Sequence, residues 1–157
     1  MRVIRYYAPE VRDITWSDAM LKIDSDVQED KFICIRHNDD NYTLHTKDKL
    51  MVVRGDIPTI VCESSYVPTT FLPVCSRVQK DWGMNEFHTY ISMSKRTSTF
   101  GRHNDTMDVL IVQAMGRVTY RFDDAVVKLS PGDAVFIPEG EYHDPIVHGP
   151  RITLSFS

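Results

Sequence analysis

From Phe87 onward the chain consists of short runs of residues that favour β-strands, and this feature restricts the possible fold most. Each run is four to seven residues long and rich in Val, Ile, Tyr or Phe, and turn residues separate most of the runs. Many short strands joined by tight turns are typical of a β-sandwich or a small β-barrel. The runs are residues 87–93, 109–115, 117–122, 125–129, 134–137 and 152–156.

Helix signals lie in the N-terminal half of the chain. Thr15 is a suitable N-cap with Asp18 at the capping-box position, and a short apolar stripe follows. Residues 70–82 form a second candidate helix that stops at Gly83, a residue common just past helix C-termini. Its apolar residues at helical spacing are Leu72, Cys75, Val78 and Trp82. We expect these helices to pack outside the β-structure.

Three further β-rich runs lie between the two helices, at residues 31–36, 42–46 and 50–54. Residues 38–41, Asn-Asp-Asp-Asn, predict a turn between the first two runs. A chain of 157 residues is long enough for one domain with a core and leaves little room for a second. We therefore expect one mainly β domain over residues 1–157, in which residues 1–65 flank a barrel formed by residues 66–157.

Composition argues against several classes of protein. The net charge of −4 gives no overall attraction to nucleic acid, and no run approaches the roughly 20 apolar residues of a membrane span. No long apolar run follows the first five residues, as it would in a signal peptide. The three cysteines, Cys34, Cys62 and Cys75, are odd in number and widely spaced. This pattern predicts reduced thiols in a cytoplasmic protein.

Two histidines and an aspartate are the strongest candidates for a functional site. His103 and Asp105 are separated by one residue, so on an extended chain their side chains point to the same face. Together with His143 they are the residue set of the two-histidine-one-carboxylate triad. That triad holds non-haem Fe(II) on one face and leaves the opposite positions open for an oxidant and a co-substrate. We predict that the three residues are metal ligands and catalytic residues.

Two motifs around these residues resemble known ones. Residues 132–143 read Gly-x5-Pro-x-Gly-x2-His and resemble the second signature motif of the cupin superfamily. Residues 101–117 contain His-x-Asp-x-x-Asp-Val and Gln-x-x-Gly-Arg, and resemble the Jumonji-type hydroxylases, above all the ribosomal-protein oxygenases. Tyr90, Ile91 and Ser92 resemble the tyrosine-containing strand that precedes the triad in that family. The likeness extends from about residue 71 to the C-terminus.

The resemblance implies a cupin, or double-stranded β-helix, barrel with a few flanking helices. It also implies an Fe(II)- and 2-oxoglutarate-dependent dioxygenase that uses O2 to hydroxylate a C–H bond. His103, Asp105 and His143 would be the iron ligands. The substrate would be a protein side chain or a small molecule, with neither a membrane nor nucleic acid as a partner. Cupin relatives often dimerise, so a homodimer is one alternative for this chain.

One departure from the family pattern concerns the co-substrate. Two residues after the glycine of Gly-Arg, these hydroxylases usually have a Lys or Arg that binds the distal carboxylate of 2-oxoglutarate. Here the residue is Val118, which cannot neutralise a buried carboxylate. Arg151 and Thr153 share one face of the last strand and resemble the acid-binding Arg-x-Thr or Arg-x-Ser pair of other 2-oxoglutarate oxygenases. We predict that they bind the acid, unless they belong to a polar outer face.

Several other residues have two interpretations. Tyr90 and Tyr120 are candidates for additional hydroxyl donors to the acid. Asp108 either orients a metal ligand or caps a turn, and Gln113 either lines the pocket or faces solvent. Arg117 and Arg121 alternate with Val118 and Tyr120 and should face outward if the latter face inward.

Three functions therefore remain open. The first is the oxygenase, and the second is a metal-binding cupin enzyme that does not use 2-oxoglutarate, which Val118 favours. The third is a cupin binding module without catalysis. We expect substrate contacts in the first 70 residues and in the loop 94–99, because loops on a rigid scaffold usually carry them.

Overall fold

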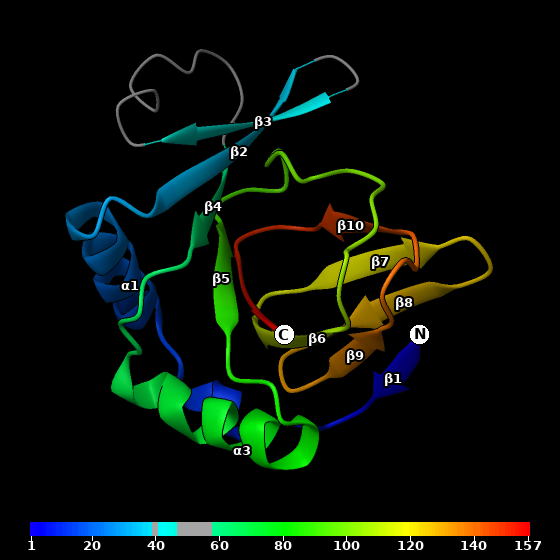
Figure 1. The fold of residues 1–157 in the computed structure, drawn as a ribbon, viewed down its shortest axis with the longest axis horizontal. Coiled ribbons are helices and arrows are strands. Elements are labelled where there is room, and N and C mark those ends of the chain that lie inside the picture. Colours follow the sequence, from blue (N-terminus) through cyan, green and yellow to red (C-terminus); the bar gives the residue numbers. More distant parts are fainter. Residues whose placement is uncertain (39–40, 47–57) are drawn as a thin grey trace.

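The computed structural model describes residues 1–38, 41–46 and 58–157, and within them the chain is mainly β, as predicted (Figure 1). The strands are β1 Arg2–Ile4, β2 Phe32–Asn38, β3 Asn41–Thr46, β4 Thr59–Cys62, β5 Phe87–Ser92, β6 Val109–Met115, β7 Val118–Phe122, β8 Val126–Leu129, β9 Ala134–Ile137, β10 His143–Val147 and β11 Arg151–Phe156.

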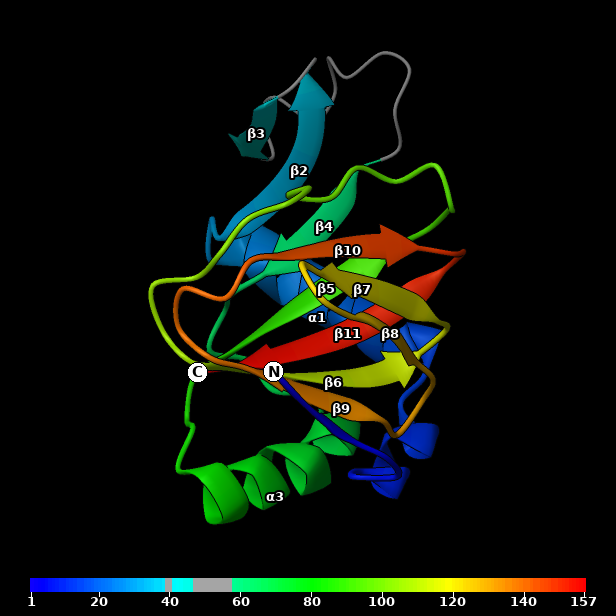
Figure 2. The ribbon, with the colours of Figure 1, turned by 90° about the vertical axis from the view of Figure 1, so that its right-hand side faces the viewer.

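Two antiparallel sheets face each other. The larger has eight strands in the order β1-β9-β6-β11-β5-β4-β2-β3, and the smaller has three in the order β10-β7-β8. In Figure 2 the smaller sheet lies in front of the central strands of the larger one. No continuous hydrogen-bonded ladder joins the sheets in the described residues, so the expected cupin barrel has the form of a β-sandwich that is not closed.

Beyond a single bridge between His143 of β10 and His103, both edges of the small sheet have a physical reason to pair with no further strand. On β10, Pro145 lacks the N–H group that a further strand would need. On β8, the carbonyl oxygen of Lys128 accepts a hydrogen bond of 2.7 Å from the Arg5 side chain instead of from a strand. A proline and a covering arginine therefore end this sheet where a barrel would continue.

The six strands predicted after residue 86 are all present, with ends that differ from the prediction by one residue at most. β2 and β3 match the predicted runs 31–36 and 42–46, and Asn38 pairs with Asn41. Residues 39–40 of the predicted turn and the predicted run 50–54 lie outside the described residues. The sequence prediction missed β1 and β4, two short strands of three and four residues, and gave no range for β10.

The described helices are α1 Trp16–Gln28 and α3 Leu72–Trp82, with short 3-10 turns η1 Pro9–Asp13 and η2 Thr69–Phe71. Thr15 and Asp18 form the predicted capping box, and Gly83 ends α3 with a φ of 73°. The predicted stripe of α3 is partly wrong, because Leu72 is 48% exposed whereas Val74 is buried. None of the helices in the described ranges has the length and hydropathy to cross a membrane.

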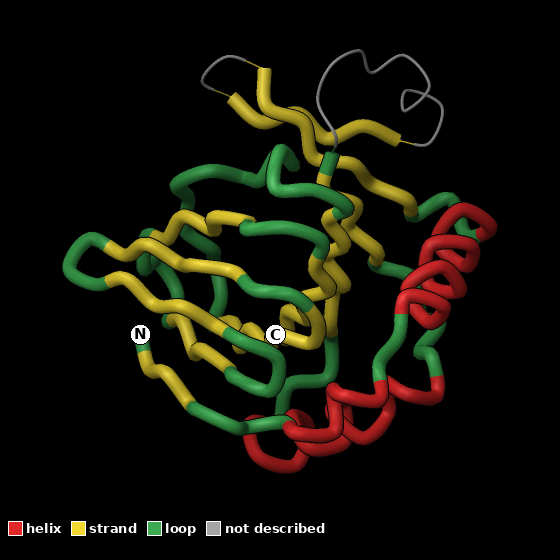
Figure 3. Tube along the Cα trace, turned by 180° about the vertical axis from the view of Figure 1, so that it is seen from behind, coloured by secondary structure: helices red, strands yellow, loops and turns green. Residues whose placement is uncertain are grey.

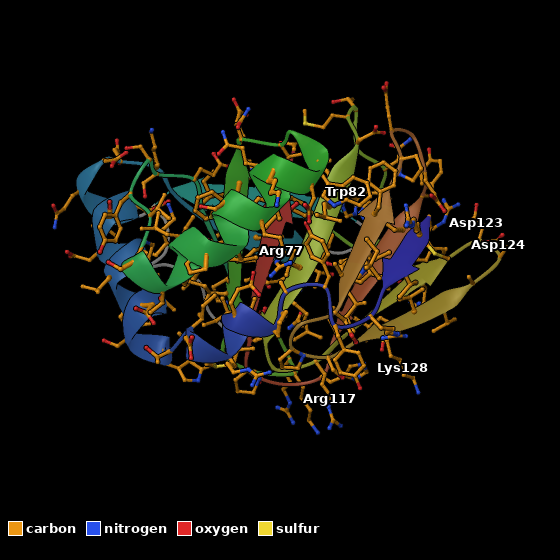
Figure 4. The ribbon with its side chains drawn as sticks, turned by 90° about the horizontal axis from the view of Figure 1, so that it is seen from below. Arg77, Trp82, Arg117, Asp123, Asp124 and Lys128 are labelled. Carbon is orange, nitrogen blue, oxygen red and sulfur yellow. The ribbon has the colours of Figure 1, made fainter. Side chains whose placement is uncertain are left out.

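Two apolar layers flank the large sheet. The first lies between its outer face and the helices, which cover that face together (Figure 3). In this layer Trp82 of α3 stacks on Phe136 of β9 with ring centroids 4.9 Å apart (Figure 4). The second layer lies between the two sheets and includes Ile111, Val118 and Leu129. The helices therefore pack outside the β-structure, as predicted, and the space between the sheets is left for a pocket.

A buried ion pair fixes α1 to the end of β4. Lys22 and Asp26 are both fully buried, with 3.5 Å between Nζ and Oδ1. Lys22 Nζ donates to the carbonyl oxygen and the hydroxyl of Ser64, and Asp26 accepts from the backbone N–H of Glu63 and of Ser64. Further hydrogen bonds satisfy both charges, which is what makes such a buried pair tolerable.

Gly116 allows β11 to begin close to the turn between β6 and β7. Its φ is +73°, and a Cβ atom placed on it would lie 2.1 Å from the carbonyl oxygen of Pro150 and 3.1 Å from the Cα of Arg151. The first contact is impossible without moving the backbone, and the second is tight. The glycine of the Gly-Arg motif therefore fixes where Arg151 enters the sheet.

We expect Gly116→Ala to lower the free energy of unfolding by about 2 kcal/mol or more, because it adds this clash to the backbone strain. Gly83→Ala is the matched control, since Gly83 has the same φ of 73° and open space around it. That substitution should cost about 1 kcal/mol for the left-handed conformation alone. Urea unfolding measures both variants, and equal losses would show that the close approach is unimportant.

Candidate metal centre

The structure brings His103, Asp105 and His143 together between the two sheets. Each offers one ligand atom, and these atoms lie within 4.8 Å of one another. Nε2 of His143 is 3.6 Å from Oδ2 of Asp105, and the two imidazole centroids are 4.3 Å apart. The backbones of the two histidines also form a β-bridge, with N–H to carbonyl distances of 2.9 and 2.8 Å in the two directions. The bridge holds the rings side by side.

Both imidazole rings are oriented by backbone carbonyls. Nδ1 of His103 lies 2.8 Å from the carbonyl oxygen of Gly101, and Nδ1 of His143 lies 3.1 Å from that of Glu141. A carbonyl oxygen only accepts, so each Nδ1 carries the proton and each Nε2 presents its lone pair. Burial lowers the pKa of His143. A neutral His143 is the form that a metal requires.

Aromatic side chains surround the triad. The Phe100 ring lies 5.3 Å from the His103 ring, and the rings of Tyr120 and Phe122 lie 6.0 and 6.3 Å from that of His143. The triad therefore lies in a largely aromatic environment.

A cavity of about 340 Å³ opens beside the triad. Its wall includes the three candidate ligands together with Tyr90, Tyr120 and Arg151. Of the four residues predicted to bind the acid, three therefore share one pocket with the triad. The fourth, Thr153, is buried and its hydroxyl turns to Gln113 instead.

Arg151 is the most unusual charge in this pocket. The residue is 2% exposed, and its Nε and Nη1 atoms donate to the hydroxyls of Ser92 and Thr153, each at 3.1 Å. In the described part of the chain no carboxylate lies within ion-pair distance of it. Burial lowers its pKa, and the hydroxyls of Tyr120 and Tyr90 oppose that effect. Arg151 and Thr153 are thus no polar outer face, since both are buried.

The structure also places the other residues singled out in the sequence. Val118 is fully buried in the apolar layer between the sheets. Arg121 is exposed and pairs with Asp144, and Arg117 points away from the sheets (Figure 4). Asp108 accepts a 2.9 Å hydrogen bond from the backbone N–H of Glu139, so it braces a loop and orients no ligand.

Sequence reasoning missed several polar residues at the site. Ser92 contacts Arg151, and its hydroxyl lies 3.0 Å from that of Thr59. Glu63, which follows β4, lines the pocket beside His88, with 3.7 Å between Oε1 and Nδ1. Ser92 and Tyr90 are two residues apart on β5 and so share one face, which was the only signal in the sequence. Thr59 and Glu63 could not be placed because β4 was not predicted.

The sequence of the second half and the fold of the chain are similar to those of known proteins. Residues 88–155 match the family model of the AraC-like ligand binding domain. None of the curated proteins matches the chain in sequence. Among solved structures, the ribosomal oxygenase YcfD from Escherichia coli superposes with a TM-score of 0.75 at 16% identity. Its complex with cobalt and succinic acid gives 0.74 at 17%, and its complex with cobalt and 2-oxoglutarate gives 0.71 at 16%.

Each of these superpositions covers 99% of this chain and 47% of the YcfD chain. The chain thus spans about half the length of the structures that it matches. TM-scores of 0.71–0.75 show a common fold, and at 16–17% identity they leave the activity to be argued from the site itself. The chain therefore has the cupin fold, in the form that the ribosomal oxygenase YcfD also has.

Proposed function

We propose that this protein is a non-haem Fe(II)- and 2-oxoglutarate-dependent oxygenase that hydroxylates a protein side chain or a small molecule. One observation carries the proposal: two oriented histidines and an aspartate share a pocket with a buried arginine that has no carboxylate partner in the described residues. A metal and an acid are the two ligands that these groups require. YcfD, which has the same fold, was crystallised with cobalt and 2-oxoglutarate.

The residues of the triad fit Fe(II). Two imidazole nitrogens and one carboxylate oxygen are the ligand set of the non-haem Fe(II) oxygenases. His103 and His143 present Nε2 because backbone carbonyls hold both Nδ1 protons. Fe(II) held by these residues would supply the activation of O2 that is coupled to the oxidative decarboxylation of 2-oxoglutarate to succinate and CO2. The protein's own contribution is to hold the three donors on one side and to keep aromatic rings around them.

Arg151 is our candidate for binding the distal carboxylate of 2-oxoglutarate. Its guanidinium lies in the pocket wall, and an anion there would offset the cost of burying its charge. Tyr90 and Tyr120 contribute hydroxyls to the same wall. Val118 of β7 fits this arrangement. The positive charge that the family usually has at this position would come from Arg151 of β11 instead.

A turnover experiment tests the proposal. The protein is purified without oxygen, loaded with Fe(II) and given 2-oxoglutarate and O2, and succinate is measured. Some succinate should form without substrate, and Fe(II) with 2-oxoglutarate should give a metal-to-ligand absorption band before O2 is added. Failure of 2-oxoglutarate to bind to the Fe(II)-loaded protein would refute the proposal.

A ligand-binding module without catalysis is the second candidate. The match of residues 88–155 to the AraC-like ligand binding domain favours it. The same pocket would then bind an acid through Arg151, and the three candidate metal ligands would only shape the pocket wall. Binding of 2-oxoglutarate that is independent of metal, without succinate formation, would favour this function over the oxygenase.

A further inference from the structure

Neutral hydroxyl groups of the large sheet hold the Arg151 side chain in place. Its Nη1 donates to Thr153, and its Nε donates to Ser92, whose hydroxyl meets that of Thr59 at 3.0 Å. The Thr59 hydroxyl in turn lies 3.0 Å from that of Thr97, in the loop that follows β5. A carboxylate in place of either hydroxyl that accepts from Arg151 would neutralise the guanidinium. Neutral hydroxyls orient it and leave its charge for a ligand.

Gln113 of β6 sets the direction of these hydrogen bonds. The residue is fully buried, and its Nε2 donates to the carbonyl oxygen of Met115 at 2.6 Å. Its Oε1 must therefore face the hydroxyl of Thr153, which lies 2.8 Å away. An amide oxygen only accepts, so the one proton of the Thr153 hydroxyl goes to Gln113. The lone pairs of Thr153 are then left for the Nη1 proton of Arg151.

We propose that Gln113, acting through Thr153, is a positioning residue that turns the Arg151 guanidinium toward the pocket. The proposal rests on the proposed function, because it explains how the acid-binding arginine is oriented. It also assigns Thr153 a new role: its proton is committed to Gln113, so it supports Arg151 and does not donate to the acid. Arg151 has five N–H groups. Two are used on Thr153 and Ser92, and the others are left for the Tyr120 hydroxyl and the ligand.

The test compares the dissociation constants of 2-oxoglutarate for the anaerobic Fe(II)-loaded protein and its variants. Thr153→Val keeps the shape and loses the hydroxyl, and it should raise the dissociation constant about tenfold or more. Thr153→Ser keeps the hydroxyl and should bind like the unaltered protein. Gln113→Leu should weaken binding when Thr153 is present and have no further effect in the Thr153→Val background, because the two residues act in series.

Thr119→Val is the matched control. Thr119 is also a buried strand threonine whose hydroxyl contacts one side chain, His148, at 2.6 Å, away from Arg151. This variant should leave the affinity for 2-oxoglutarate unchanged, and all variants should keep the affinity for Fe(II). Unchanged binding in Thr153→Val, failure of Thr153→Ser to restore binding, or additive losses in the double variant would each overturn the proposal.

A second measurement separates this proposal from the proposed function. In nitrogen-15-labelled protein without metal, the oriented guanidinium should show separate Nη–H signals for Arg151 at low temperature. Thr153→Val should merge them, and Thr153→Ser should keep them apart. If the unaltered protein bound no 2-oxoglutarate, the proposed co-substrate would fail, and these signals would still decide the role of Gln113 and Thr153. Signals that are the same in all three proteins would refute it.

Discussion

Asp105→Ala is expected to lower the affinity for Fe(II) at least about 100-fold and to reduce succinate formation to the background rate. Loss of a residue that only supports a metal ligand costs up to about 100-fold, and Asp105 would contact the metal directly. Its side chain is 33% exposed, so its removal leaves no large cavity. The fold should therefore survive the substitution. Competition with a chelator under anaerobic conditions measures the affinity.

Asp108→Ala is the control for this prediction. Asp108 lies in the same segment before β6 and carries the same charge, but its carboxylate accepts from the backbone N–H of Glu139. Its removal should cost about 1 kcal/mol of stability and leave the affinity for Fe(II) within a few-fold of the original. Equal losses of affinity in both variants would mean that general charge, and not the triad, attracts the metal.

The strands of the second half were predictable because local patterns determine them. β6, with the sequence Val-Leu-Ile-Val-Gln-Ala-Met, and β9 have no plausible alternative, and turn residues mark their ends. The failure of the two sheets to close into one barrel was not predictable in the same way. It depends on Pro145 and on the contact of Arg5 with β8, and Arg5 is distant from that strand in sequence.

The candidate site was predictable where a motif spans it. His103 and Asp105 are separated by one residue, and His143 is the last residue of the Gly-x5-Pro-x-Gly-x2-His motif. The environment of Arg151 was not predictable, because it is assembled from β4, β5, β6 and β11. Alternation placed Arg151 and Thr153 on one face, but only the structure shows that the face is buried.

Arg151→Met should raise the dissociation constant of 2-oxoglutarate about 30-fold or more in the Fe(II)-loaded protein. Truncating one partner of a buried charge pair costs about 2–5 kcal/mol of binding free energy. The affinity for Fe(II) should stay within a few-fold, because Arg151 contacts none of the three candidate ligands by hydrogen bond or ion pair in the described residues. Calorimetry with 2-oxoglutarate measures the binding. The control is Arg121→Met, which removes an exposed arginine of β7 and should change neither affinity.

The same variant should not lower the free energy of unfolding of the ligand-free protein. Arg151 carries the cost of a buried charge without a carboxylate, and methionine removes that cost while filling most of the space. Ser92 keeps its contact with Thr59, and Thr153 keeps Gln113, so both hydroxyls that accept from Arg151 Nε and Nη1 keep another partner. Loss of binding without loss of stability distinguishes a ligand-binding arginine from a structural one. A marked fall in the urea midpoint with unchanged binding would assign Arg151 to the structure and the acid to another group.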